Sequence, residues 1–257
     1  MNWTLRFLGV GNAGAAPELG SASAVIERDG APFLMIDCGQ EALSAYLDRY
    51  KAPPRAIYIT HTHMDHVGGI ERLFYKIYFD ANLRGRVRLY AHAALVPHLQ
   101  SRVADYPEVL AEGGANFWDA FALVPLSRGF WHENVWFDVF ATRHHAPGTS
   151  YGLALDGSFV WTGDTRPVPE MLAKYAAHHE LVAHDCALVG NPSHTGLDDL
   201  VREYPVELRE RFVLYHFASH DDAAELARHG YRVAERDQAL PIAAPRVNAP
   251  VAEAVRS

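Results

Sequence analysis

Short apolar runs alternate with stretches of helical spacing along most of the chain. The runs rich in β-branched and aromatic residues predict strands. They cover residues 5–10, 24–26, 33–36, 57–60, 87–90, 136–142, 153–155, 159–161 and 212–215. Apolar positions at helical spacing predict helices over residues 41–50, 69–79, 168–178, 197–203 and 223–229. Strands interleaved with helices in this way predict an α/β protein.

The chain is expected to form one domain followed by a tail. We find no repeat and no low-complexity linker in the sequence, so residues 1–234 are assigned to a single domain. After residue 234 the chain is rich in proline and alanine and has no aromatic side chain. Because such a segment has little to bury, residues 235–257 are predicted to be an extended or mobile C-terminal tail.

Composition narrows the classes of protein to consider. With 49% hydrophobic and 21% charged residues, the chain has the make-up of a globular protein. No apolar run approaches the ~20 residues that span a bilayer, so no membrane partner is expected. The net charge of -8 disfavours general nucleic-acid binding. The N-terminus lacks a secretory signal, and Cys38 and Cys186 are too few for a disulfide framework, so we expect a cytoplasmic protein.

Histidine is abundant, with 15 copies, and its densest group follows the predicted strand over residues 57–60. His61, His63, Asp65 and His66 fall there within six positions, before two glycines and a helix. The carboxyl end of a strand is where α/β sheets place ligand sites. His61 and His63 lean to the same side of an extended backbone. One ion cannot easily use all four of these side chains as ligands, but two adjacent ions can. The alternative is a polar turn that happens to be rich in histidine.

This His-x-His-x-Asp-His pattern resembles the signature of the metallo-β-lactamase superfamily. The resemblance runs in chain order over about residues 5–220. The sequence FLG at 7–9, with GSAS at 20–23, is similar to the opening strands of ribonuclease Z and its phosphodiesterase relatives, which form the branch that the chain resembles most. The resemblance implies a four-layer αββα sandwich, the metallo-β-lactamase fold, with a dinuclear metal site.

Further motifs match the metal ligands of that superfamily. The sequence DCG at 37–39 resembles the landmark whose aspartate supports the metal site from behind. In HHAPGT at 144–149, the His-x-x-x-Ser/Thr spacing implies that His145 is the third metal histidine. The stretch TGDTRP at 162–167 is very close to that of ribonuclease Z, which makes Asp164 the bridging carboxylate, and His216 takes the position of the last ligand. One ion would then be held by His61, His63 and His145, and the other by Asp65, His66 and His216, with Asp164 shared.

The implied site has a definite chemistry. Imidazole and carboxylate donors without thiolate suit zinc, although manganese and iron also fit. Two divalent ions outweigh the charges of Asp65, Asp164 and a bridging hydroxide, so the site would attract a small anionic substrate. Such a pair makes a hydroxide available at neutral pH and stabilises the attacking and leaving oxygens. Asp65 is counted both as a ligand and as a catalytic candidate. We expect a phosphodiesterase that acts on a small or cyclic nucleotide-like phosphodiester through a metal-bound hydroxide.

A second pair of motifs indicates a general acid. HDCA at 184–187, followed by SHT at 193–195, resembles the His-Glu-Ala-Thr and His-Ser-Thr pair of ribonuclease Z-type phosphodiesterases. The resemblance implies that Asp185 orients His194, which donates a proton to the leaving oxygen. A positioned histidine typically contributes ~10²–10⁴-fold to the rate. Aspartate is one methylene shorter than the family's glutamate, and the alternative for His194 is a loop position beside a helix cap.

Two departures argue against transfer RNA as the substrate. Ribonuclease Z enzymes that mature transfer RNA carry a long arm that grips the substrate, inserted between the third metal histidine and the Gly-Asp-Thr stretch. Between His145 and Asp164 this chain has no room for such an arm. The family's arginine after the last ligand is also absent here, since the chain leads to His220 instead.

Several alternatives stay open. The same metal site could hydrolyse a carboxylic ester, a lactone or a thioester, because a Lewis acid polarises a carbonyl too. A non-catalytic metal-binding sensor on the same fold is a third reading. Aromatic residues crowd between positions 71 and 140, where they could form a lid over the site or pack in the core or a dimer interface. Similar proteins are commonly dimers, so a homodimer is one expectation. His132 and His144 are candidates to line the pocket.

Overall fold

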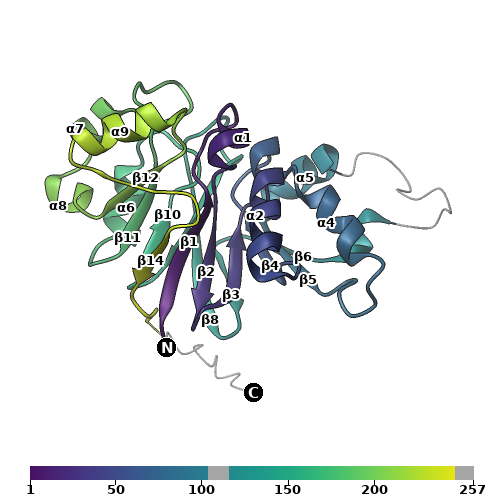
Figure 1. Ribbon diagram of the computed structural model, residues 1–257. Helices are drawn as coiled ribbons and strands as arrows, with labels where there is room; N and C mark the ends of the chain where they lie inside the picture. The colour runs from purple at the N-terminus through teal and green to yellow at the C-terminus, as the bar shows by residue number, and fades with distance from the viewer. Residues whose placement is uncertain (104–115, 247–257) are drawn as a thin grey trace, which may run out of the picture.

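The computed structural model describes residues 1–103 and 116–246. Two seven-stranded sheets pack face to face, and helices cover the outer face of each sheet (Figure 1). This arrangement confirms the predicted α/β class and the αββα layering. None of the helices in the described ranges is long and apolar enough to cross a bilayer.

The first sheet has the strand order β14-β1-β2-β3-β4-β5-β6. Its strands are β1 (Trp3–Gly9), β2 (Ser23–Arg28), β3 (Ala31–Ile36), β4 (Ala56–Ile59), β5 (Val87–His92), β6 (Phe121–Leu126) and β14 (Ala239–Ile242). The helical segments that accompany it are α1 (Ala16–Leu19), α2 (Gln40–Tyr50), α3 (Met64–Val67), α4 (Ile70–Ile77), η1 (Ala93–Leu95), α5 (Val96–Val103) and η2 (Phe117–Ala120). Helices α2 and α4 bury apolar side chains such as Leu43 and Phe74 in the outer core of this sheet.

The second sheet has the strand order β13-β12-β11-β10-β9-β8-β7. Its strands are β7 (Gly129–His132), β8 (Val135–Ala141), β9 (Tyr151–Leu155), β10 (Phe159–Trp161), β11 (Leu181–Asp185), β12 (Phe212–Tyr215) and β13 (Arg232–Val233). Its helices are α6 (Pro169–Tyr175), α7 (Leu197–Glu203), α8 (Val206–Arg209) and α9 (His220–Arg228). They form the outer layer on the side of the molecule away from α2 and α4 (Figure 1).

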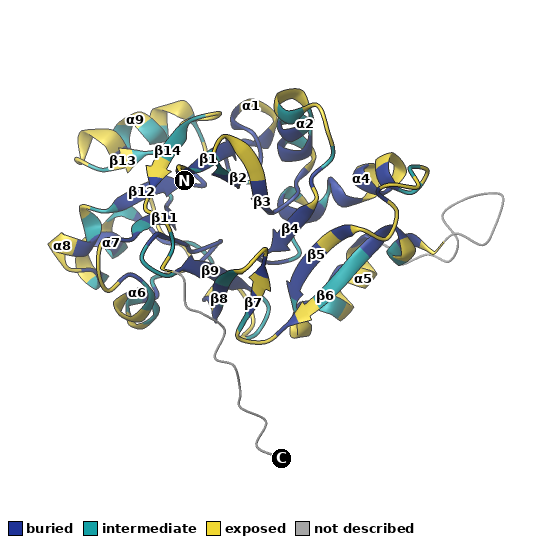
Figure 2. Cartoon of the chain, turned by 90° about the horizontal axis from the view of Figure 1, so that it is seen from below, coloured by how far each residue is buried: buried dark blue, intermediate teal, exposed yellow. Residues whose placement is uncertain are grey.

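An aromatic core holds the two sheets together. Trp161 of β10 stacks on Tyr215 of β12 with ring centroids 4.2 Å apart, and Phe7 of β1 lies 5.7 Å from Trp161. All three side chains are fully buried. Figure 2 shows that most strand residues are buried, whereas the helices carry exposed residues. Large aromatic rings contribute strongly to the energetics of cores. The contact between Phe7 and Trp161, which belong to different sheets, therefore helps to hold the two sheets face to face.

The aromatic residues between positions 71 and 140 divide between core and surface. Phe74 stacks on Phe117 with centroids 4.9 Å apart, and Phe130 stacks on Phe137 at 5.1 Å, and all four are buried. For these residues the structure supports core packing rather than a lid. Phe79 is 68% exposed. Residues 104–115 of this segment lie outside the described residues.

Strand direction decides where the loops of the site emerge. Strands β3, β4 and β5 are parallel, as are β10, β11 and β12. Strand β8 is antiparallel to β9, and β9 is antiparallel to β10, so β8 runs in the same direction as β10. The carboxyl ends of β8, β10, β11 and β12 therefore meet at one edge of their sheet. Backbone bonds tie this edge to the first sheet, since Tyr151 N donates to Thr60 O at 3.0 Å and His216 N donates to Val10 O at 2.6 Å.

Part of the predicted C-terminal tail forms a strand that the sequence analysis did not expect. Residues 239–242 form β14, which pairs with β1 and places Leu240 opposite Leu5. Residues 239–242 of the predicted tail therefore belong to the sheet. A proline at position 241 is tolerated because β14 is an edge strand. Residues 247–257 of the tail lie outside the described residues.

Candidate metal centre

The loop between β4 and α3 brings the residues of the His-x-His-x-Asp-His motif to one place. His63 O accepts hydrogen bonds from the backbone N–H groups of His66 and Val67, both at 3.0 Å. This tight turn brings the ring of His66 to 4.1 Å from that of His61. His61 and His66 are buried, whereas His63 and Asp65 are partly exposed. The motif thus has a buried inner side and an open outer side.

Asp37 supports this loop from behind, at the position that the family resemblance implied. It follows β3 and adopts a φ of 59°, in the left-handed region that is costly for a residue other than glycine. One carboxylate oxygen accepts from Thr60 N at 2.8 Å. The other accepts from Thr60 Oγ1 and from His66 Nδ1, both at 2.8 Å. The bond from Nδ1 leaves Nε2 of His66 directed toward the cluster.

Gly39 allows two backbone segments to approach each other beneath the motif. A Cβ atom added at Gly39 would lie 2.0 Å from the carbonyl oxygen of Asp65 and 2.5 Å from Ser21 Oγ. Real Cβ atoms do not come that close to a carbonyl oxygen, so only glycine fits without moving the loop that carries Asp65.

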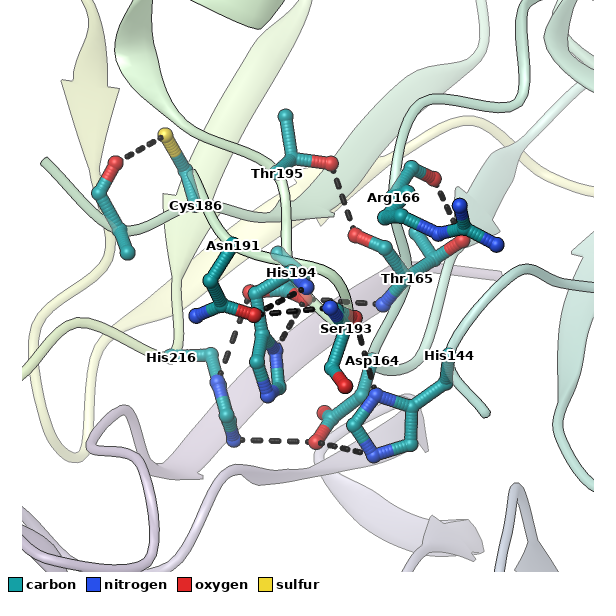
Figure 3. Close-up of polar contacts among 12 residues, drawn as sticks. His144, Asp164, Thr165, Arg166, Cys186, Asn191, Ser193, His194, Thr195 and His216 are labelled. Carbon is teal, nitrogen blue, oxygen red and sulfur yellow. Dashed lines mark hydrogen bonds and ion pairs between the residues drawn. The ribbon is translucent and has the colours of Figure 1, made fainter. Parts of the chain in front are cut away.

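The second sheet supplies the other half of the cluster. His144 follows β8, Asp164 follows β10 and His216 follows β12. His216 has a φ of 71°, an uncommon backbone conformation that turns the chain directly after the strand. Figure 3 shows the side chains of His144, Asp164 and His216 pointing toward one another. Segments far apart in the chain therefore converge because their strands end at one edge.

The Oδ2 atom of Asp164 lies at the centre of the cluster. Four imidazole Nε2 atoms lie close to it, at 3.1 Å in His216, 3.4 Å in His66, 3.6 Å in His61 and 3.7 Å in His144. Two groups of potential ligand atoms, each within 4.8 Å of one another, surround it: His61, His63, His144 and Asp164 in one, and Asp65, His66 and His216 in the other.

The donor atoms of this cluster fit divalent metal binding. His61 Nε2, His66 Nε2, His216 Nε2 and Asp164 Oδ1 are buried, and they have no hydrogen-bond partner among the described residues. Buried polar atoms without partners are costly, and these converge on one point. Burial lowers the pKa of His61 well below its usual value, which favours the neutral imidazole that binds metal. Burial raises the pKa of Asp164, but the nearby imidazoles of His216, His66 and His61 outweigh burial and lower it, which favours the carboxylate.

The structure brings a different histidine to the cluster from the one that the family spacing implied. His144 is buried and lies in the cluster, whereas His145 is exposed and lies outside that group. The alternation of β8 continues past its last residue, so that Thr142 and His144 face inward while Arg143 and His145 face outward. His144 Nδ1 donates to Ser193 O at 3.0 Å, which directs Nε2 toward Asp164. His144 rather than His145 therefore lies among the potential ligands, and this alternation was the signal that could have indicated it.

Asp185 and His194 come together as the family resemblance implied. His194 Nδ1 donates to Asp185 Oδ2 at 2.8 Å, and Thr165 N donates to the same oxygen at 2.8 Å. The shorter aspartate therefore reaches the histidine. The ring of His194 stacks on His216 with centroids 4.8 Å apart, and a ligand atom of His194 lies within 4.8 Å of those of Asp164 and His216. Burial lowers the pKa of His194, but the hydrogen bond to Asp185 outweighs it and raises the pKa above its usual value.

The remaining histidine candidates do not join the cluster. His132 is buried in the core, where its Nε2 donates to Phe33 O at 3.0 Å. His220 is exposed and lies 3.5 Å from a carboxylate oxygen of Glu18. Neither contact brings these residues to the site.

A cavity of about 450 Å³ borders the outer side of the motif. His63 and Asp65 are among the residues that line it, together with Gln40, Glu41 and Met64. Pockets of roughly 300–1,000 Å³ are typical of small-molecule sites. The cavity therefore provides space for a small molecule directly beside two of the candidate ligands.

Comparisons with known proteins agree with this geometry. The family model described as Anti-Pycsar protein Apyc1 matches residues 3–240. A relative of that name from Saccharibacillus brassicae is 31% identical over 226 residues, which cover 85% of this chain and 91% of that protein.

Solved structures show the same fold. The metallo-β-lactamase fold protein YhfI from Bacillus subtilis superposes with a TM-score of 0.72 at 14% identity, over 94% of this chain and 100% of that one. A diphosphatase from the PhnP family superposes with a TM-score of 0.73 at 18% identity, over 93% and 97% of the two chains. The expected metallo-β-lactamase fold is confirmed. Together with the His/Asp cluster, these findings support a metal-dependent hydrolase.

Proposed function

Because this chain belongs to the Anti-Pycsar protein Apyc1 family and has the metallo-β-lactamase fold, we propose that it is a metal-dependent phosphodiesterase acting on a small, cyclic-nucleotide-like phosphodiester. One observation carries the proposal. Buried imidazoles from both sheets converge on Asp164, and Asp185 holds His194 at the same point.

The cluster offers two adjacent places for ions. We assign His61, His63 and His144 to one ion and Asp65, His66 and His216 to the other, with Asp164 between them. The donor set favours zinc. When bound, a pair of divalent ions supplies a nucleophile at neutral pH and compensates the charge of a phosphoryl group.

Groups behind the ligands fix the orientation of the rings. Asp37 accepts from His66 Nδ1, Thr60 Oγ1 lies 3.0 Å from His61 Nδ1, and Ser193 O accepts from His144 Nδ1. Each of these bonds leaves the Nε2 atom of the ring free for a metal ion. Such partners commonly raise metal affinity by one to two orders of magnitude.

His194 is the side chain that can protonate the leaving oxygen. Asp185 holds its Nδ1, so Nε2 is free to donate a proton to a substrate bound at the cluster. The raised pKa of His194 keeps the ring protonated over more of the neutral range. An alkoxide departs poorly without a proton, and a general acid typically contributes ~10²–10⁴-fold to the rate.

The space around the cluster favours a small substrate. The cavity of about 450 Å³ adjoins His63 and Asp65. Between His145 and Asp164 the chain forms only the antiparallel pair β9–β10, with no arm that could grip a transfer RNA. These two features support a mononucleotide-sized diester.

The test is a set of paired rate assays on protein of known metal content. Hydrolysis of bis(p-nitrophenyl) phosphate and of cyclic mononucleotides is compared with hydrolysis of p-nitrophenyl acetate and of a simple lactone, with and without chelator. We expect turnover of the diesters that chelator abolishes and added zinc restores. Turnover of the ester or lactone alone would replace the proposal by acyl hydrolysis. A protein that binds metal but hydrolyses none of these substrates would be a sensor.

His194→Ala sharpens the assay, with His98→Ala as the matched control because His98 is an exposed histidine on α5. We expect His194→Ala to keep its metal and to lose roughly 10²-fold or more in cyclic nucleotide hydrolysis, whereas His98→Ala retains full activity. An unchanged rate in His194→Ala would remove the role assigned to this residue.

A further inference from the structure

Most histidines of the cluster follow one rule. His66 and His144 bond through Nδ1 to Asp37 and to Ser193 O, at 2.8 and 3.0 Å, and direct Nε2 inward. His61 does the same with Thr60 Oγ1 at 3.0 Å; this hydroxyl gives its own proton to Asp37, so it accepts from His61 Nδ1. His216 Nδ1 faces Asp185 Oδ1 at 3.4 Å. Each inward nitrogen therefore has its lone pair free.

His63 is oriented the other way round. Its Nδ1 atom lies 3.1 Å from the inward Nε2 atom of His144, and its Nε2 atom faces His145, which lies outside the cluster. Two nitrogens bound tetrahedrally to one zinc ion at about 2.0–2.1 Å lie about 3.3–3.4 Å apart, close to this separation. Nδ1 is therefore the nitrogen of His63 that is placed to bind the ion. Its Nε2 atom must then carry the proton and needs an acceptor.

His145 provides that acceptor. Its Nε2 atom lies 2.9 Å from His63 Nε2. A bond between two imidazole nitrogens requires a proton on one and a lone pair on the other, so His145 accepts through Nε2 and carries its own proton on Nδ1. His145 Nδ1 in turn faces Ser193 Oγ at 3.4 Å. Ser193 thus contacts the two neighbouring histidines His144 and His145. The carbonyl oxygen of Ser193 accepts from His144, and its hydroxyl faces His145.

We propose that His145 is a positioning residue, which accepts the Nε2–H of the metal ligand His63 and joins that ligand, through the Ser193 hydroxyl, to the loop that carries His194. The inference rests on the proposed function, since it takes the cluster to bind metal. It gives an exposed histidine beside the site a role that is neither ligation nor contact with substrate. The alternatives are that His145 binds the ion directly or binds the substrate.

The experiment measures metal affinity rather than turnover. Full-length His145→Ala, His145→Gln and the control His179→Ala, which changes an exposed histidine after α6, are titrated with zinc against a chromogenic chelator. We expect His145→Ala to keep the wild-type stoichiometry at saturating zinc and to bind one ion about 10–100-fold more weakly, as is typical when such a partner is lost. His145→Gln should recover part of the affinity, because its carbonyl oxygen can accept the same proton.

Ser193→Ala tests the link to the loop. It removes the hydroxyl but keeps the carbonyl oxygen that accepts from His144. We expect Ser193→Ala to weaken zinc binding in the wild-type background and to add nothing in the His145→Ala background, since residues of one network are not additive. Fully additive effects of the two changes would overturn the link.

The outcomes separate the inference from the function on which it rests. Loss of one ion from His145→Ala even at saturating zinc would show ligation and overturn the positioning role. Unchanged zinc affinity with a raised KM would show substrate contact and also overturn it. If the wild-type protein itself binds no zinc, manganese or iron, the proposed function fails instead.

Discussion

Replacing Asp185 by asparagine tests whether one carboxylate serves two histidines. Three donors face this fully buried side chain. His194 Nδ1 and Thr165 N each lie 2.8 Å from Oδ2, and His216 Nδ1 lies 3.4 Å from Oδ1. Asparagine offers one acceptor oxygen and one donor group of nearly the same size. The amide NH₂ of asparagine must therefore face at least one of these N–H groups in place of a carboxylate oxygen, and the negative charge is lost for all three.

The expected loss follows from these contacts. The hydrogen bond to the Asp185 carboxylate is the interaction that raises the pKa of His194. A hydrogen bond to a charged group contributes ~1.5–3 kcal/mol, and the substitution removes that charge. The pKa of His194 then falls, because burial of the ring, which lowers it, is no longer opposed. Since a general acid contributes ~10²–10⁴-fold, we expect kcat for a cyclic nucleotide to fall roughly 10²-fold. A p-nitrophenyl diester should lose less, because its leaving group departs without a proton.

The assay is kcat as a function of pH at saturating zinc, with Asp48→Asn as the control because Asp48 is an exposed carboxylate on α2. His194 must be protonated to act, so activity falls as the pH rises through its pKa. In Asp185→Asn this basic limb should move to lower pH, while Asp48→Asn keeps the wild-type profile. A basic limb that does not move, with equal losses for both leaving groups at full metal content, would refute the reasoning.

Three further predictions concern the cluster and the frame around it. Asp164→Ala should lose most of the bound metal and more than ~10³-fold of the activity, and normal zinc content by atomic absorption with a normal rate would contradict the bridging assignment. Gly39→Ala should lower the free energy of unfolding by ~1–3 kcal/mol in urea titrations, because its Cβ would meet the carbonyl oxygen of Asp65 at 2.0 Å; wild-type stability would show that the loop moves freely. Burial raises the pKa of Glu27, but hydrogen bonds from Arg6 and two hydroxyls outweigh burial and lower it below its usual 4.5. The stability that Glu27 contributes is therefore present above about pH 4.5 and is lost as the pH falls through the lowered pKa. Glu27→Gln should cost about 3 kcal/mol near pH 7 and much less near pH 3, and a cost independent of pH would contradict this ion-pair account.

The part of the site that is local in sequence could be predicted from the sequence. His61, His63, Asp65 and His66 lie within six positions after a strand, so their spacing alone places them together. Asp164 and His216 could be placed because each follows a strand in a motif similar to a known one. In each case the prediction needed only the direction of one strand.

Contacts between distant loops could not be predicted in the same way. Spacing favoured His145 over His144, although the backbone alternation after β8 turns His144 inward. Ser193 fixes His144 from a loop that follows β11, and a side chain's partner across such a distance leaves no periodic signal in the sequence. The short strand β14 escaped prediction for a related reason, since its pairing with β1 depends on an edge that exists only in the folded sheet.

The most direct test of the central claim is a zinc titration of chelator-stripped protein, with hydrolysis of a cyclic mononucleotide measured at each step. We predict that the metal-free protein is inactive and that activity returns as zinc binds. Activity should saturate at about two ions per chain, as expected of a two-metal site. Hydrolysis by the metal-free protein, or full zinc binding without hydrolysis of any phosphodiester, would contradict the account.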